Sequence, residues 1–123
     1  MSAGEVTVED HATISGLCGV HQFCRIGRHA MIGASSLIVQ DAAPYFITGG
    51  NPAAAAAINL VGLTRRGFSE ETRRVLKSAH KLLCRSGLNV SDALAEIGKT
   101  LPDLPELAHL VEFFKTTQRG VIR

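Results

Sequence analysis

The chain has no tryptophan, one tyrosine and only five phenylalanines among its 123 residues. No aromatic side chain interleaves with the basic residues, so a surface that stacks nucleic-acid bases is not expected. No uninterrupted apolar run reaches the roughly 18 residues that a membrane-spanning helix needs. The first residues also lack the pattern of a secretory signal peptide. We therefore expect neither a membrane span nor a nucleic-acid partner.

Cysteine is scarce as well. Cys18, Cys24 and Cys84 make an odd count, and they fall in predicted regular elements rather than in a loop framework. This usage is typical of reduced thiols in a cytoplasmic protein. Apolar residues make up 46% of the chain and charged residues 20%, which favours a packed fold over disorder. The length fits one domain, or one small domain with an appendage.

A six-residue period runs through the first third of the chain. Each hexad carries one aliphatic residue, and a small residue follows it four positions later. The aliphatic residues are Val8, Ile14, Val20, Ile26, Ile32 and Ile38, and the small residues are Ala12, Cys18, Cys24, Ala30, Ser36 and Ala42. This period matches neither a helix nor an ordinary alternating strand, although an alternating sheet is the alternative. It favours short strands joined by tight corners, with the aliphatic side chains pointing inward.

The period divides the chain into three parts. Residues 1–44 are predicted to form coils of a β-helix, and the repeat stops at residues 41–44. Residues 45–68 are predicted to be a loop or linker, because they contain a Gly-Gly-Asn-Pro sequence and then a low-complexity alanine run. Residues 69–123 are predicted to be a small helical domain, since their apolar residues recur at helical spacing.

Three helices are expected in this last part. Ser69 is a suitable N-cap with two glutamates after it, and Gly87 suits the C′ position of the same helix. Ser91 is expected to cap a second helix that ends before Pro102. Pro105 is expected to begin the third.

Positive charge is concentrated in residues 65–85, which hold seven basic residues against Glu70 and Glu71. On a helical wheel, five bases share one face, opposite the apolar residues. These bases are Arg73, Arg74, Lys77, Lys81 and Arg85. Like charges four residues apart repel one another, by a few tenths of a kcal/mol per pair. The pattern therefore favours an anionic partner over the alternative of an ordinary solvated face.

Several short segments resemble one family in order and spacing. They are GVHQFCRIG at 19–27, GNP at 50–52, GLTRRGFS at 62–69, RSG at 85–87 and RGVIR at 119–123. Together they are similar to the C-terminal part of the bacterial UDP-N-acetylglucosamine O-acyltransferases of lipid A biosynthesis. The resemblance implies a truncated left-handed parallel β-helix followed by helices, in a cytoplasmic homotrimer without a metal or other cofactor. It also implies hydroxyacyl transfer from acyl carrier protein to UDP-N-acetylglucosamine.

The resemblance also implies roles for particular residues. Gly4 would be a backbone oxyanion donor, and Ala34 would set the acyl-chain length by its bulk. The implied substrate-binding residues are His21, Gln22, Asn59, Arg65 and Arg66. Acyl carrier protein is acidic, so the five bases at residues 73–85 would form its docking surface.

Three departures from the family pattern argue against activity of this chain alone. The coil that bears the family's general-base histidine is expected upstream of Met1, Glu5 replaces a histidine, and Val61 replaces a glutamate. The alternatives are a non-catalytic trimeric module that binds acyl carrier protein or nucleotide sugar, and a plain trimerisation domain.

Two other histidine arrangements suggest competing chemistry. His11 and His29 should stack in one column of adjacent coils, about 4.8 Å apart, where a zinc site is conceivable. No third ligand is evident, and both residues are expected to face solvent. His80 and Cys84 lie four residues apart on a predicted helix, but no third group orients them as a nucleophilic pair.

Overall fold

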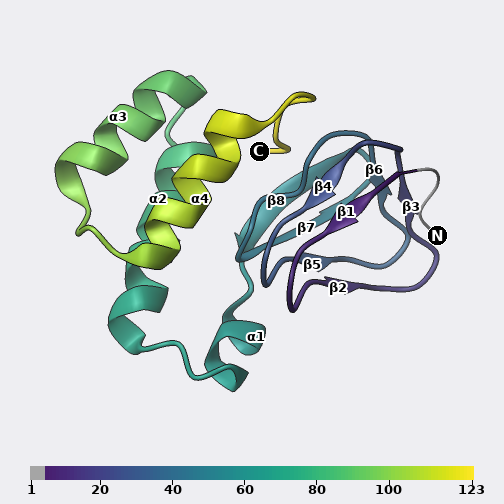
Figure 1. Cartoon of the computed structure of the whole chain (residues 1–123), viewed down its shortest axis with the longest axis horizontal. Helices are drawn as coiled ribbons and strands as arrows, with labels where there is room; N and C mark the ends of the chain where they lie inside the picture. Colours follow the sequence, from purple (N-terminus) through teal and green to yellow (C-terminus); the bar gives the residue numbers. More distant parts are fainter. Residues whose placement is uncertain (1–4) are drawn as a thin grey trace.

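The computed structural model describes residues 5–123. Its first part is a coil of six two-residue strands. They are β1 (Thr7–Val8), β2 (Thr13–Ile14), β3 (Gly19–Val20), β4 (Arg25–Ile26), β5 (Met31–Ile32) and β6 (Leu37–Ile38). Each strand of the first turn pairs in parallel with the strand directly above it: β1 with β4, β2 with β5 and β3 with β6. Three hexads therefore make one turn, as the six-residue period indicates (Figure 1).

The aliphatic residues of the hexads point into the coil. Ile26, Ile32 and Ile38 are completely buried there, together with Cys18 and Cys24. Val8 and Ile14 occupy the equivalent positions in the first turn but remain 48% and 36% exposed. In the described part of the chain β1 and β2 each have a parallel neighbour on one side only, so this end of the coil presents apolar side chains and unpaired backbone groups.

The corners of the coil adopt the left-handed backbone conformation, with φ between 57° and 67° at six residues other than glycine. His11, His29 and Tyr45 mark one corner, Leu17 and Ser35 a second, and Phe23 the third. Gly27 lies against the backbone of Pro44 so closely that a Cβ atom would overlap it. Glycine is therefore required at that position.

The prediction that residues 45–68 form a loop or linker is wrong for most of that segment. Phe46–Gly50 forms β7 and Ala53–Ile58 forms β8, an antiparallel hairpin whose first strand pairs in parallel with β5. Leu60–Arg65 then forms the short helix α1. The alanine run becomes a strand because β7 supplies hydrogen-bond partners on one side and helix α2 packs on its face, burying Ala55 and Ile58. Neither partner is visible in the composition of the segment.

Three longer helices follow: α2 (Glu70–Cys84), α3 (Val90–Thr100) and α4 (Pro105–Thr116). Ser69 caps α2 by accepting from the Thr72 backbone N–H at 3.1 Å, as expected. Pro105 begins α4, also as expected. The cap of α3 is Asn89 and not Ser91, because the Asn89 side chain accepts from Asp92 N–H at 2.8 Å. The positive φ of Gly87 falls in the turn after α2, and Arg85 is the C-cap.

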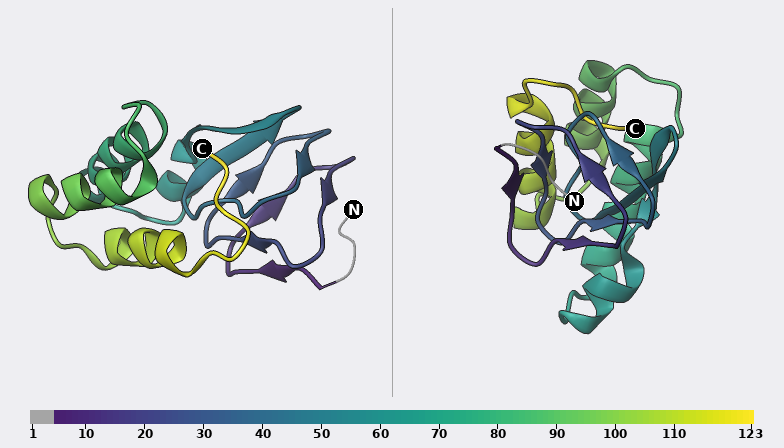
Figure 2. Two further views of the ribbon diagram at one scale, coloured as in Figure 1. Left: turned by 90° about the horizontal axis from the view of Figure 1, so that it is seen from above. Right: turned by 90° about the vertical axis from the view of Figure 1, so that its right-hand side faces the viewer.

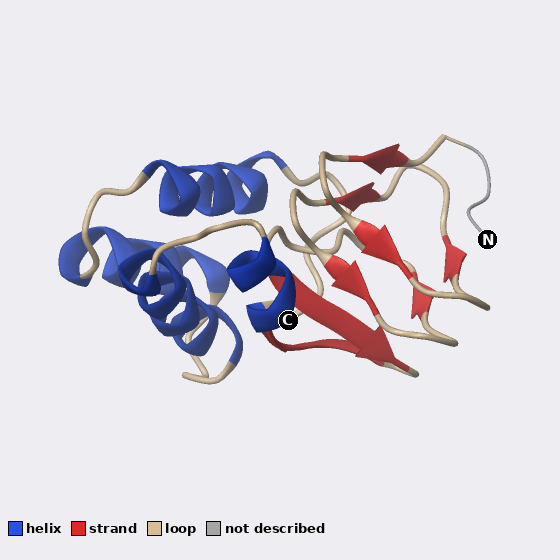
Figure 3. Ribbon diagram, turned by 90° about the horizontal axis from the view of Figure 1, so that it is seen from below, coloured by secondary structure: helices blue, strands red, loops and turns tan. Residues whose placement is uncertain are grey.

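The hairpin joins the coil to the helices. Figures 1 and 3 show α2, α3 and α4 gathered at one end of the molecule and the coil at the other, with β7 and β8 reaching between them. The apolar face of α2 lies over the hairpin, and its Val75, Leu76, Ala79 and Leu83 are buried in the shared core. Within residues 5–123, no helix is long and apolar enough to cross a membrane.

Candidate functional site

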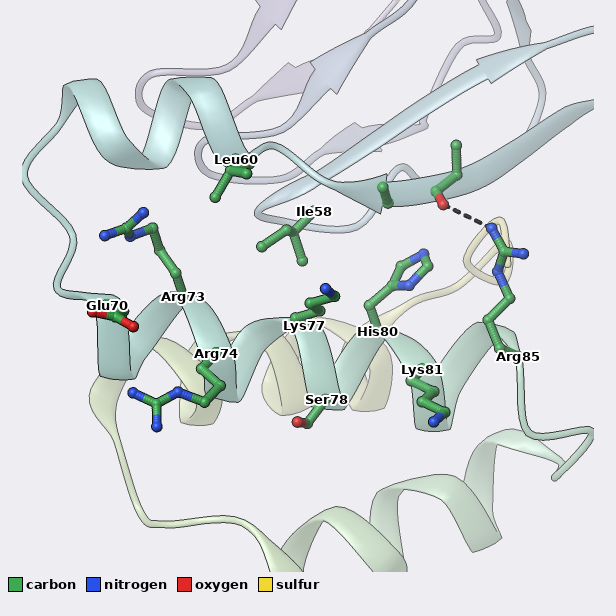
Figure 4. Close-up of a pocket in the computed structure, with 12 residues that line it drawn as sticks. Ile58, Leu60, Glu70, Arg73, Arg74, Lys77, Ser78, His80, Lys81 and Arg85 are labelled. Carbon is green, nitrogen blue, oxygen red and sulfur yellow. Dashed lines mark hydrogen bonds between the residues drawn. The ribbon is translucent and has the colours of Figure 1, made fainter.

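A basic groove lies between α2 on one side and β8 with α1 on the other (Figure 4). Its volume is about 1050 Å³. Ala56, Ala57, Ile58 and Leu60 form an apolar floor. All five bases of the helical-wheel prediction line the groove: Arg73, Arg74, Lys77, Lys81 and Arg85. Glu70, in the first turn of α2, is the one acidic residue among the groove's lining side chains within the described chain.

Two of these arginines are held at opposite ends of the groove. Arg85 Nη2 donates to the Ala56 carbonyl of β8 at 2.9 Å, which Figure 4 marks with a dashed line. Arg73 Nη1 donates to Thr64 Oγ1 of α1 at 3.1 Å. The long side chains therefore bridge the two walls while their charge remains near the opening.

His80 also lines the groove, where its ring contacts Phe46 and the backbone of Ala55. The His80 ring is buried edge-on against Phe46, with ring centroids 4.8 Å apart, and Nε2 is 2.8 Å from the Ala55 carbonyl oxygen. Desolvation lowers the pKa of His80, so the ring is neutral at pH 7 and donates from Nε2. Burial raises the pKa of Cys84 to about 11, which keeps it a thiol and argues against a nucleophile.

The residues implied for nucleotide-sugar binding divide between two corners of the coil. His21 and Gln22 are exposed and directly precede the Phe23 corner. Asn59 lies beside the other corner, donating from Nδ2 to the His29 carbonyl at 3.1 Å. Asn59 is the N-cap of α1, Arg65 is the last residue of that helix, and Arg66 is its C-cap. One copy of the chain therefore does not bring the two groups together.

Asn59 has a structural role that the resemblance did not indicate. Its Oδ1 accepts from Gly62 N–H at 3.2 Å and caps α1, while Nδ2 holds the coil corner. The side chain is buried. An asparagine just before a helix is a recognisable cap signal, although α1 itself was not predicted.

The remaining positions that the resemblance singles out are Gly4, Ala34, Glu5 and Val61. Gly4 lies outside the described residues. Ala34 is exposed next to the Ser35 corner, and Glu5 and Val61 are exposed as well.

The His11–His29 column exists, but the expectation that both face solvent is wrong. The rings stack with centroids 4.9 Å apart, and His29 is buried. Tyr45 stacks on its other side, and Phe68, which follows α1, packs edge-on at 4.9 Å. Burial lowers the pKa of His29 first, and neighbouring His11 and Arg66 add to that effect. No group of three or more potential metal ligands occurs within the described chain.

The helices touch the first turn of the coil through another histidine. His109 Nε2 on α4 lies 3.1 Å from Glu9 Oε1, and the same oxygen accepts from Arg28 N–H at 2.8 Å. In the described residues this is the one histidine within ion-pair distance of a carboxylate. It joins α4 to the coil, away from His21.

The chain resembles one group of known proteins over nearly its whole length. The family model for UDP N-acetylglucosamine O-acyltransferase, domain 2, matches residues 41–122. An acyl-[acyl-carrier-protein]–UDP-N-acetylglucosamine O-acyltransferase of Burkholderia orbicola is 46% identical over 98% of this chain and 48% of its own length. The chain thus spans about half the length of the curated relatives that it matches.

Solved structures agree with the sequence match. A UDP-N-acetylglucosamine acyltransferase from Bacteroides fragilis superimposes with a TM-score of 0.96 at 41% identity, covering 98% of this chain and 48% of its own. LpxA from Acinetobacter baumannii gives a TM-score of 0.93 at 39% identity, covering 99% of this chain and 48% of its own.

Proposed function

Because the chain belongs to the UDP-N-acetylglucosamine O-acyltransferase family, we propose that it forms the carrier-docking and nucleotide-binding part of a lipid A acyltransferase. It binds acyl carrier protein and UDP-N-acetylglucosamine in the cytoplasm as a homotrimer with a left-handed coil. It does not catalyse acyl transfer by itself. A second candidate, which the same groove also supports, is a module that binds acyl carrier protein without any catalytic assembly.

The basic groove carries this proposal. Its bases face an apolar floor formed by Ile58, Leu60 and the alanines of β8. That combination suits an acidic protein that presents an amphipathic surface, since charge steers the encounter and the apolar floor provides area to bury. Acyl carrier protein, the strongly acidic acyl donor of the family, has the charge that this groove complements.

The nucleotide-sugar site requires more than one copy of the chain. Arg65 and Arg66 can bind a diphosphate through their planar guanidinium groups, but His21 and Gln22 lie at a different corner of the same coil. A closed three-fold arrangement, in which the Phe23 corner of one copy faces α1 of the next, brings the two groups together. Large exposed apolar side chains on the coil support such an assembly: Leu17, Phe23, Leu37 and Val39.

In this proposal, no described residue acts as the general base of this site. A base needs a histidine or carboxylate within reach of the reacting hydroxyl, usually oriented by another group. His109 and Glu9 make such a pair, but they are part of the contact between α4 and the coil. Loss of a general base typically costs about 10²–10⁴-fold in rate. Gly4, the implied oxyanion donor, and Ala34, the implied chain-length residue, would act only within a complete cleft.

The test is the affinity of the purified chain for acyl carrier protein. Combined replacement of Arg74, Lys77 and Lys81 by glutamate reverses three exposed charges at the groove and leaves the bridging Arg73 and Arg85 in place. We expect binding to weaken by at least about tenfold, and to weaken with added salt, since exposed charges are screened beyond roughly 8 Å at physiological ionic strength.

A matched control is Lys99→Glu with Lys115→Glu, two exposed lysines on α3 and α4 outside the groove. These changes should leave the affinity for acyl carrier protein nearly unchanged. Equal affinity of the groove variant and the parent, at the same oligomeric state, would show that the groove is not the docking surface.

A further inference from the structure

The last residues of the chain return from α4 to the coil (Figure 2). Asp41 N–H donates to the Gly120 carbonyl at 3.0 Å, and Ile122 N–H donates to the Asp41 carbonyl at 2.9 Å. Val121 pairs with Asp41 as an isolated parallel bridge. The Ile122 side chain is buried with the interior of the coil. These contacts make the tail a structural part of the coil rather than a loose end.

The tail carries Arg119 to the surface beside His21. Arg119 Nε donates to the Val39 carbonyl at 3.4 Å, and its own carbonyl accepts from Gln40 Nε2 at 3.0 Å. Arg119 Nη2 then lies 3.4 Å from His21 Nδ1. The next residue, Gly120, has φ of 84°, and a Cβ atom there would overlap Gln40 Nε2. Both the backbone and the side-chain contacts therefore aim the guanidinium at the ring.

The direction of this contact determines which ring nitrogen carries hydrogen. A guanidinium group has only donors, so His21 Nδ1 must accept with its lone pair. The neutral ring then carries its hydrogen on Nε2, at the far side of the imidazole. The protonated ring has hydrogens on both nitrogens, so it cannot make the contact. Because His21 is exposed, its Nε2–H can reach a ligand.

We propose that Arg119 is a positioning residue that holds His21 as the Nε2–H tautomer, so that His21 donates a hydrogen bond to an acceptor oxygen of the bound nucleotide sugar. The ligand part rests on the proposed function of the site. In this state His21 is a hydrogen-bond donor and not a proton acceptor. The contact therefore gives a physical reason why His21 does not substitute for a general base.

The tautomer can be measured without any ligand. Long-range proton–nitrogen NMR spectra of protein labelled with nitrogen-15 in histidine distinguish the two ring nitrogens, and His21→Gln identifies the His21 signals by their loss. At about pH 8 we expect the parent to show the Nε2–H form. Arg119→Leu should shift the Nδ1 resonance and admit the Nδ1–H form. Arg119→Lys, which keeps a donor, should lie between the two.

Arg123→Leu is the control, because Arg123 also belongs to the tail but donates to the Leu83 and Leu88 carbonyls. It should leave the His21 signals unchanged. If Arg119→Leu leaves the Nδ1 resonance of His21 as in the parent, the proposal is wrong. If Arg123→Leu moves it equally, general packing of the tail, and not Arg119, controls the ring.

A double-mutant cycle on UDP-N-acetylglucosamine binding tests the consequence. Losing one hydrogen bond should weaken binding by about threefold to tenfold in Arg119→Leu and in His21→Phe. If Arg119 acts through His21, adding Arg119→Leu to His21→Phe causes no further loss, whereas independent roles give additive losses. If the parent itself fails to bind the nucleotide sugar, the proposed function fails, and the tautomer measurement still decides the role of Arg119.

Discussion

The guanidinium of Arg25 lies 4.1 Å from the centroid of the Phe113 ring and donates a hydrogen bond of 2.9 Å to the Phe113 carbonyl. Arg25 belongs to β4 of the coil and Phe113 to α4. The same guanidinium lies 3.4 Å from the buried carboxylate of Asp41, which also accepts from Thr117 Oγ1 at 2.6 Å. Coil, helix and tail therefore meet at one charged cluster.

Replacing Arg25 should destabilise the protein. Arg25→Leu removes a charge-assisted hydrogen bond, a cation–π contact and one partner of the buried Asp41. We expect a loss of about 2 kcal/mol in the free energy of unfolding, measured by urea denaturation. Arg25→Lys keeps a charge without the planar group and should lose less. Arg74→Leu, on an exposed side chain of α2, is the control; an equal loss there would contradict the account.

Burial of His29 makes stability depend on pH. Its folded pKa lies below the ordinary value of 6.5, mainly through desolvation, with smaller effects of His11, Arg66 and Arg28 in the same direction and of Asp10 in the opposite one. Near and below pH 6.5 the unfolded chain therefore binds more protons than the folded chain. The contribution of His29 to stability is complete above pH 6.5 and is lost as pH falls toward the lowered folded pKa.

His29→Phe tests this dependence, since phenylalanine keeps a ring between Tyr45 and Phe68 but cannot be protonated. As the pH falls from about 7.5 to about 5, the free energy of unfolding should decrease less in His29→Phe than in the parent. His80, whose pKa is also lowered, should retain part of the slope. His21→Phe, on an exposed side chain, serves as the control. An undiminished slope in His29→Phe would contradict the role of the buried ring.

Oligomer formation should depend on the exposed apolar residues of the coil. Leu37 on β6 is 51% exposed in the isolated chain. A trimer that buries this face should dissociate when Leu37→Glu places a charge there, because an unpaired buried charge is costly. Light scattering at micromolar concentration should report a trimer for the parent and smaller species for the variant. Ala95→Glu, on the exposed face of α3, should remain trimeric. A monomeric parent would contradict the proposed assembly.

Much of this structure follows from local patterns in the sequence. The hexad repeat predicts the strands and the buried Ile26, Ile32 and Ile38. This is because the side chain that points into the coil occurs at the same position of each six-residue repeat. The spacing of bases on α2 predicts that they share one side of the helix. Both features depend only on regular backbone geometry.

The remaining features depend on contacts between distant segments. The alanine strand β8 exists because β7 and α2 are next to it, and the groove exists because β8 supplies its floor. Arg119 reaches His21 only through the returning tail, and no local pattern marks that contact. Likewise, His21 and Asn59 are separated because they lie at different corners of the coil. Matching individual residues to a family does not reveal this separation.

The most direct test of the central claim is product formation by the purified chain, supplied with hydroxyacyl acyl carrier protein and UDP-N-acetylglucosamine at concentrations where carrier binding is saturated. A chain that docks both substrates without a general base should form no acylated nucleotide sugar above a protein-free reaction. Turnover above that background would show that the described residues do contain a working base, and would contradict the account.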